Sequence, residues 1–565
     1  MSDTAVESER EAPAEWSADD DWTDEALALL RAMRAPHRRQ RAKQAAFAVY
    51  CTLLVLVVWG AVPSLGLFLQ ASMGADYTRH GGLLLAAMPS GITALGLATV
   101  LLVVRDGLWR GPVVPPRATA DWLLAHPVRP RPVLRPWFWL SCALAVFPGL
   151  VTACGGMVAL GLTAGVGLPA ALGWCLVGGV CLPLLATCAG LLVERSDRAA
   201  GWVRRLTPYL TLLVLALGTQ STLAAAGHPV RWLERVELWS GPWGWAGIAA
   251  LAPTRAAVPG GWLAAGLLVV PTVGCLVLAD RAAATVSLHR LRARARAAAG
   301  VLAALRTVEL RAARLTVTSA SGGTRQRRVR LPAPRRAWLV VPWRDALALL
   351  RSPGRLGRAV VLAVPALLCA DLVHGLSGGA ALLATAAALV FGYLAVAQLL
   401  EPARIETDDI RRASWSPYSV PGLMLRHAIV PTVLGTLPAL AGAALVVLDG
   451  GGPAAWLAPA AVPALVGAGL VNACRGVLRQ DLLISPAQGA GGGTGPLLFA
   501  VWYAAGPLVA VAALTLPFVT ALHGPTAAPL GKAVAFSLLL ATALLRWAWG
   551  RAGKLGGRPR PGAGG

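Results

Sequence analysis

The sequence contains few charged residues. Asp, Glu, Lys and Arg make up only 14% of its 565 residues, and 56% of the residues are apolar. An average soluble chain has about 25% charged residues. The mean hydropathy is correspondingly high, at +0.62. These values exclude a string of ordinary soluble domains and predict an all-α, polytopic integral membrane protein.

Lysine and acidic residues are scarce. There are 51 basic against 27 acidic residues, and only Lys43, Lys532 and Lys554 are lysines. This arginine bias, with abundant Ala, Gly and Pro, is typical of a GC-rich bacterial genome. In a soluble protein the net charge of +24 would suggest nucleic acid. In a membrane protein the cytoplasmic loops collect Lys and Arg, so we expect a topological signal and no nucleic-acid partner.

Sequence signatures of catalysis, metal binding and nucleotide binding are missing. The nine cysteines fall in or beside apolar runs and form no CxxC pair, which predicts core residues rather than disulfides or metal ligands. The histidines form no metal-binding pair, and the Walker A pattern GxxxxGK[ST] is absent. We therefore expect no enzyme activity, no cofactor and no metal in this chain.

Acidic residues that could carry ion-coupled transport are few. Asp371, with His374 three residues later, lies near the end of an apolar run. We interpret it as an interfacial residue that reaches the outer water, with a proton or substrate site as the alternative. Among the outside acids only Glu234 and Glu237 are close in sequence, and they fit one exposed helical turn.

Apolar runs divide the chain into two halves. A membrane-spanning helix needs about 20 apolar residues, and the sequence predicts about twelve, as a loose 6+6 repeat. The first half is 26–280 and the second is 341–552, and a basic cytoplasmic linker, 281–340, joins them. The predicted spans are 46–70, 82–104, 138–161, 168–193, 206–226 and 261–279, then 359–376, 379–400, 428–448, 453–474, 496–520 and 530–548.

The basic residues follow these spans in alternation. With the N-terminus inside, 46 of the 51 basic residues fall in inside segments and five fall outside, as expected for a bacterial inner membrane protein. We expect both termini in the cytoplasm. Residues 1–25 hold ten acids and one Arg, which predicts a disordered acidic tail rather than a signal peptide. Residues 553–565 form a basic Gly/Pro-rich tail.

Two short segments recur in the halves. Ala-Leu-Ala-Leu-Leu-Arg occurs at 26–31 and again at 346–351, each time before the first span of its half. Its one-sided apolar face suits a helix that lies in the inner membrane interface, although chance similarity in an Ala/Leu-rich chain is the alternative. A looser repeat relates the loops 122–135 and 414–426, between the second and third spans.

The linker carries arginine at every second position near its start: Arg290, Arg292, Arg294 and Arg296. We interpret this run as a cytoplasmic connector that touches anionic lipid headgroups. A denser acidic group lies just before the second loop. This group consists of Glu401, Glu406, Asp408 and Asp409. We interpret it as a salt-bridged helix face, with the docking of a partner protein as the alternative.

These features together resemble ABC-2-type transporter permeases, with two six-helix halves fused in one chain. In that family each half begins with an interfacial helix, and the loop between its second and third spans carries a coupling helix, written as leucines followed by Pro-Val-Ser-Arg. Ser is missing before Arg129, and Val420 stands where Arg is expected. The resemblance implies coupling loops that include Leu123, Leu124, Pro127, Val128, Arg129, Arg131 and Arg135, and Pro417, Ser419 and Arg426.

The resemblance implies a permease subunit of an ABC exporter, embedded in the lipid bilayer and driven by a separately encoded ATPase. Span interiors nearly free of charge favour a hydrophobic or amphipathic substrate. The resemblance also implies a re-entrant segment in the outer loop 227–260. A plain aromatic belt without such a segment is an equal alternative. A major-facilitator-like secondary transporter is the first alternative function, although Arg105–Arg110 has the residues of that family's loop motif in the wrong order. A membrane enzyme is the second.

Overall fold

The computed structural model describes residues 21–36, isolated positions between 39 and 78, and residues 81–306, 309–321, 328–373, 378–409, 413, 415–448, 452–476, 494–524 and 526–556. Helices dominate these residues, and no β-strand occurs among them. The chain divides into two compact units, residues 1–322 (unit 1) and 323–565 (unit 2).

Eleven helices in the described ranges are long and apolar enough to cross a membrane. They coincide with eleven of the twelve predicted spans and confirm an all-α, multi-pass membrane protein. The remaining predicted span, 46–70, is the first along the chain and lies almost entirely outside the described residues. Large apolar side chains, such as Leu102, Val270 and Leu383, are exposed on these helices. A soluble protein would not leave so much apolar surface in water, whereas lipid acyl chains can cover it.

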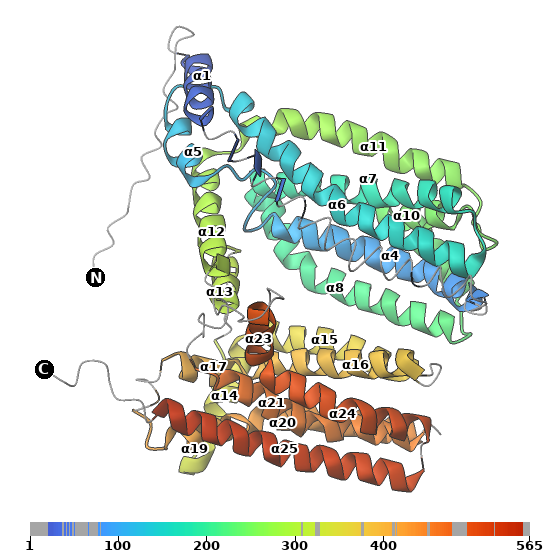
Figure 1. Ribbon diagram of the computed structural model, residues 1–565, viewed down its shortest axis with the longest axis vertical. Coiled ribbons are helices and arrows are strands. Elements are labelled where there is room, and N and C mark those ends of the chain that lie inside the picture. Colours follow the sequence, from blue (N-terminus) through green and yellow to red (C-terminus); the bar gives the residue numbers. More distant parts are fainter. Residues whose placement is uncertain are drawn as a thin grey trace, which may run out of the picture. The chain divides into compact units, whose positions relative to one another are not determined.

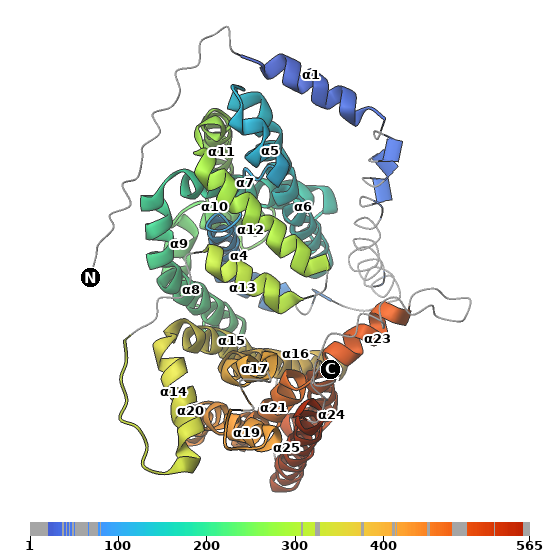
Figure 2. The ribbon, with the colours of Figure 1, turned by 90° about the vertical axis from the view of Figure 1, so that its left-hand side faces the viewer.

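Unit 1 is a bundle of five long helices that run side by side (Figures 1 and 2). Two short helices, α9 (Arg231–Trp239) and α10 (Pro242–Leu251), follow α8 at one end of the bundle. At the other end, α5 (Arg117–Asp121) and α12 (Leu288–Arg306) lie across it. The long helices are α4 (Gly81–Asp106), α6 (Pro130–Ala164), α7 (Leu168–Arg195), α8 (Asp197–Ala225) and α11 (Gly261–Ala282), and the remaining ones are α1 (Thr23–Arg34) and α13 (Leu310–Ala320).

Small residues allow the long helices of unit 1 to pack closely. Gly149 of α6 and Gly179 of α7 face one another, and a Cβ on either would collide with the backbone of the partner helix. In a membrane the hydrophobic effect does not drive helices together, because lipid tails are as apolar as the side chains. Close contacts between small residues drive helix packing instead. Proline does not end α4, which continues through Pro89. The Thr93 hydroxyl donates to the Pro89 carbonyl at 2.8 Å.

Unit 2 is a second bundle of apolar helices, built around α21 (Leu457–Ala473). At one end of it lie α14 (Val340–Arg351), α17 (Glu401–Asp408) and α19 (Val420–His427) (Figure 1). Most α21 side chains are buried, because neighbouring helices surround it. The other helices are α15 (Pro353–Leu372), α16 (Gly378–Leu399), α20 (Ile429–Leu448), α23 (Thr494–Tyr503), α24 (Ala505–His523) and α25 (Ala527–Gly556).

The described residues include Asp371 and most of the cysteines. Eight of the nine cysteines are described and all eight are free, four of them buried; Cys51 lies outside the described residues. Asp371 is exposed at the end of α15, as an interfacial residue would be. His374 also lies outside the described residues.

Candidate functional site

The helix that precedes the first predicted span is attached to the first candidate coupling loop. The Trp22 N–H donates to the carbonyl of Pro127 at 3.2 Å, and the Arg129 N–H donates to the Thr23 hydroxyl at 2.7 Å. Thr23 is only 1% exposed. These two bonds anchor the start of α1 to the loop, at the Pro-Val-Arg stretch that carries the family resemblance.

Ion pairs reinforce this attachment. The Arg129 guanidinium lies 2.5 Å from the Asp21 carboxylate and 3.7 Å from that of Asp24. A short hydrogen bond from the Thr23 hydroxyl lowers the pKa of Asp21, and Arg129 lowers it further, while burial opposes both. Arg129 therefore has acidic partners within its own chain, although its side chain is 63% exposed.

Arg131 and Arg135 both lie close to Asp280, at the end of α11. The Nε of Arg135 donates to Asp280 Oδ1 at 2.8 Å, and Arg131 lies 3.4 Å from Oδ2. The Trp139 indole N–H also donates to Oδ1, at 2.9 Å. The start of α6 is thereby tied to the end of α11, so these two arginines position the loop.

The apolar residues of this loop divide between the core and the surface. Leu124 packs against a buried cluster that includes Leu134 and Phe138, whereas Leu123 and Val128 are half-buried. Trp122 is 74% exposed and borders a hollow formed with α5 residues. Sequence reasoning did not single out Trp122, although a tryptophan in a polar loop was a signal that could have identified it.

Helix α12 holds the same end of unit 1 with its four arginines. Residues four apart share a helix face, so Arg290 and Arg294 point one way, and Arg292 and Arg296 the other. Arg294 lies 3.2 Å from Glu194, and Arg290 lies 2.6 Å from Asp197, at the junction of α7 and α8. The Arg290 side chain also donates to the Glu194 carbonyl at 3.2 Å.

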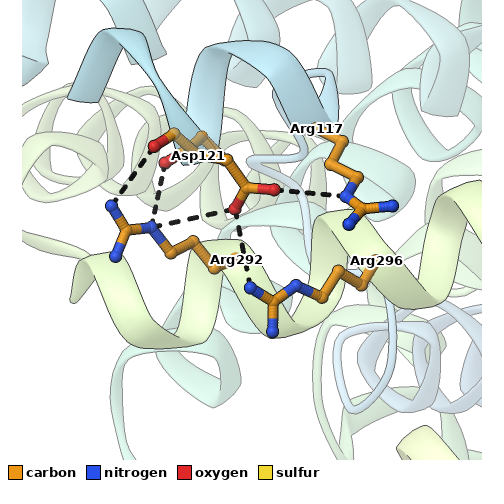
Figure 3. A network of polar contacts seen from close by, with 5 residues as sticks. Arg117, Asp121, Arg292 and Arg296 are labelled. Carbon is orange, nitrogen blue, oxygen red and sulfur yellow. Dashed lines mark hydrogen bonds and ion pairs between the residues drawn. The ribbon is translucent and has the colours of Figure 1, made fainter. Parts of the chain in front are cut away.

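The second pair of arginines, Arg292 and Arg296, contacts α5 (Figure 3). The Asp121 carboxylate lies 3.2 Å from Arg117, 3.8 Å from Arg292 and 3.9 Å from Arg296. Arg292 also donates to the Ala120 carbonyl at 3.2 Å. The α12 arginines, expected to touch lipid headgroups, thus have partners within the protein. We call these contacts of α12 with α5 and with the α7–α8 junction the arginine clamp.

Glu194 is the buried centre of the clamp. It is 0% exposed, and one of its oxygens accepts a hydrogen bond from the Val113 N–H at 3.1 Å. Gly111 has φ +75, and a Cβ there would lie 2.6 Å from the Glu194 carboxyl and from Arg294. Burial lowers the pKa of Arg294, and the charge of Glu194 opposes that shift. Removing one partner of such a pair would leave a buried charge uncompensated.

Unit 2 attaches its preceding helix differently. Asp345 of α14 lies 2.6 Å from His427 of α19, and these side chains are 2% and 1% exposed. Next to it, the Arg344 guanidinium lies 2.7 Å from Glu406 of α17. The repeated helix therefore contacts the loop after the second span of this half as well, through a buried pair.

The second candidate loop is ordered by its own short-range contacts. Ser419 caps α19, accepting from the Gly422 N–H at 3.4 Å. The Arg426 guanidinium lies 3.7 Å over the ring of Tyr418, whose hydroxyl donates to the Ala337 carbonyl at 2.9 Å. Pro417 is exposed in the preceding turn. Trp415 in that turn is 86% exposed, a second residue that sequence reasoning missed.

The acidic group before this loop is in part a salt-bridged face, as predicted. Glu401 lies 3.9 Å from both Arg355 and Arg404. Glu406 is 3% exposed and engaged by Arg344. Asp408 and Asp409 are exposed at the end of α17. A docking protein could therefore reach Asp408 and Asp409 but not Glu406.

The segment 227–260, which the sequence predicts as an outer loop, folds into the bundle. Helix α10 is mostly buried and packs against α4, α7 and α11. Gly244 allows α10 to lie close to the end of α9, because a Cβ there would collide with the carbonyls of Glu237 and Leu238. Trp232 and Trp262 are exposed nearby, as in an aromatic belt. The prediction that Glu237 lies on an exposed turn is wrong: it is 7% exposed, because α9 turns that face towards α4.

No metal-binding group of three or more His, Cys, Asp or Glu occurs in the described part of the chain. Comparison with protein-family models, curated proteins and solved structures gave no match. At one end of each bundle, a repeated helix and a loop are held together, and each loop exposes one tryptophan.

Proposed function

We propose that the chain is the membrane permease of an ABC-type exporter, driven by a separate ATPase. The observation that carries this proposal is a joint that occurs twice. In each unit, the helix before the spans is attached to the loop between the second and third spans, counting 46–70 as the first span. Each loop exposes a tryptophan, Trp122 in unit 1 and Trp415 in unit 2. Large exposed aromatics are typical anchors of protein interfaces.

The contacts give the joint a mechanical role. A force applied to the loop around Trp122 would reach α1 through Thr23, and it would reach the α7–α8 junction through α12. Rigid, hydrogen-bonded connections transmit displacement better than free loops do. In unit 2 the same force would pass from α19 to α14 through His427 and Asp345.

We further propose that this end of each unit faces the bacterial cytoplasm, where the ATPase and ATP are found. Arginine gathers there in unit 1, on α5, α6 and α12, in keeping with the positive-inside rule. The substrate in this proposal is hydrophobic or amphipathic, because the spanning helices carry almost no charge in their middle turns.

Purification of the tagged chain from its own host tests the proposal. A co-purified protein must carry a Walker A motif, and the chain must increase its rate of ATP hydrolysis. Combining Trp122→Ala with Trp415→Ala should lower recovery of the ATPase by about tenfold or more, the loss expected for two interface anchors. Trp262→Ala is the matched control, because Trp262 is 82% exposed at the opposite end of unit 1.

Transport by the purified chain in liposomes without ATP, driven by an ion gradient, would contradict the proposal. That result would favour a secondary transporter. Equal recovery of the ATPase with the double variant and with Trp262→Ala would show instead that the two loops are not its docking surface.

A further inference from the structure

Five acidic side chains are buried in the described part of the chain, and four of them have a basic partner. Those four pairs are Glu194 with Arg294, Asp280 with Arg131 and Arg135, Asp345 with His427, and Glu406 with Arg344. The fifth, Glu237, forms no ion pair with any described residue. It lies on α9, at the end of unit 1 opposite the arginine clamp.

Neutral groups surround the Glu237 carboxyl. The Ser90 hydroxyl of α4, itself 1% exposed, donates to Glu237 Oε2 at 2.7 Å. Gln220 of α8 lies beside the carboxyl, and its Nε2 is buried without an aligned hydrogen-bond partner. Helices α4 and α8 pack closely next to this site, because a Cβ on Gly91 would lie 2.9 Å from the Ser221 hydroxyl.

Among the described residues of the helices that meet at this end of unit 1, charged groups near the site lie on α9 alone. The last turns of α8, the first turns of α4 and the whole of α10 carry no charged residue. On α9, Arg231 and Arg235 are exposed, and Glu234 is one turn away from Glu237. Burial raises the pKa of Glu237, and the charge of Glu234 raises it further, while Ser90 and Gln220 oppose the shift.

We propose that Glu237 is a proton-binding site. With α9 and α10 packed on α4, the site holds a neutral carboxylic acid. The acid can accept the Ser90 hydrogen bond at Oε2. Loss of the acid's proton to the water at this end leaves a carboxylate with no counter-ion, and a buried unpaired charge is strongly unfavourable. Ionisation therefore loosens α9 and α10, which admits water to the carboxylate.

The direction of the pH effect follows from proton binding. The packed state binds the proton more tightly than the loosened state, in which Glu237 regains an ordinary pKa near 4.5. The packing of α9 and α10 is therefore strongest at low pH and weakens as the pH rises through the raised pKa. This inference does not depend on the proposed function, since it rests on contacts within unit 1.

Infrared spectroscopy of the full chain in lipid nanodiscs tests the site. The carbonyl band of a protonated carboxylic acid should persist above the pH at which exposed acids ionise, and Glu237→Gln should remove it. Glu406→Gln is the matched control and should leave the band unchanged, because Glu406 is also buried but forms an ion pair with Arg344 at 2.7 Å. A band of the same intensity in Glu237→Gln and in the wild-type chain, or its absence from the wild-type chain, would overturn the proposal.

Hydrogen exchange of residues 231–251 tests the consequence. In the wild-type chain, exchange corrected for its intrinsic pH dependence should rise about tenfold or more from low to high pH. Glu237→Gln mimics the neutral acid and should keep these residues protected at both pH values. Ser90→Ala, which keeps the carboxyl but removes its donor, should retain the pH response. A response that is unchanged in Glu237→Gln would contradict the inference.

Discussion

The two units build the same joint with different chemistry. In unit 1, α1 is attached by two hydrogen bonds and by the ion pair between Asp21 and Arg129, whose side chain is 63% exposed. In unit 2, α14 is attached by Asp345 and His427, which are almost completely buried. An exposed ion pair contributes little to stability, whereas breaking a buried one is costly. The attachment of α1 by itself should therefore be much weaker than that of α14.

Unit 1 compensates with the arginine clamp. Helix α12 holds α5 through Asp121 and the α7–α8 junction through Glu194. Unit 2 thus has its buried pair, Asp345 and His427, within the joint, whereas unit 1 has its buried pair, Glu194 and Arg294, beside the joint. The two loops can be equally rigid even though their sequences match only loosely. Four predictions, ordered from the largest expected effect to the smallest, test this comparison.

The largest effect is expected at Glu194. Glu194→Ala leaves the Arg294 charge and the Val113 N–H without their partner, and should destabilise unit 1 by about 4 kcal/mol. Denaturant titration in detergent micelles measures the change. Asp197→Ala is the control, because its side chain is 89% exposed although it also pairs with α12. Equal losses for the two variants would mean that the buried centre is not what secures the clamp.

The buried pair of unit 2 should come next. Asp345→Ala and His427→Ala should each cost about 3 kcal/mol, because each leaves a buried polar partner. The double variant should cost much less than the sum of the two, since the partners act together. A double-mutant cycle in the same titration measures the interaction. Strictly additive losses would show that the two side chains do not stabilise the joint as a pair.

An intermediate effect is expected at Asp121. Its carboxylate is partly exposed and shared by three arginines, so Asp121→Ala should cost about 1 kcal/mol. The loop should loosen more than the bundle, which hydrogen exchange of residues 117–129 would detect. Arg117→Ala keeps the α12 contacts and should leave that exchange nearly unchanged. The reverse order of effects would show that α12 does not hold α5.

The smallest effect is expected at Arg129. Arg129→Ala should leave the stability of unit 1 unchanged within error, because its side chain is 63% exposed and the Arg129 N–H bond to Thr23 remains. The pKa of Asp21 is lowered, so its contribution is present above the ordinary value of 3.8 and is lost as the pH falls through the lowered pKa. Hydrogen exchange of α1 at neutral and acidic pH measures both. A loss as large as that of Asp345→Ala would remove the contrast between the units.

Composition and periodicity were sufficient to predict the eleven spans that the described residues contain, because apolar length alone decides which helices can cross a membrane. They also located both loops and the repeated helices. The partners of Arg131 and Arg135 could not be predicted, since Asp280 lies about 145 residues away in sequence. The clamp left a local signal, arginines at every second position that form two faces on a helix. Glu237 left none, because its burial depends on how α9 packs on α4.

The rate of ATP hydrolysis by the partner ATPase, measured with the permease in nanodiscs, tests the proposed coupling most directly. The wild-type chain should raise the rate, and Trp122→Ala combined with Trp415→Ala should abolish the increase while the denaturation midpoint stays unchanged. Trp262→Ala should behave as the wild type. An increase that survives loss of both loop tryptophans would contradict the claim that these two loops couple ATP hydrolysis to the membrane helices.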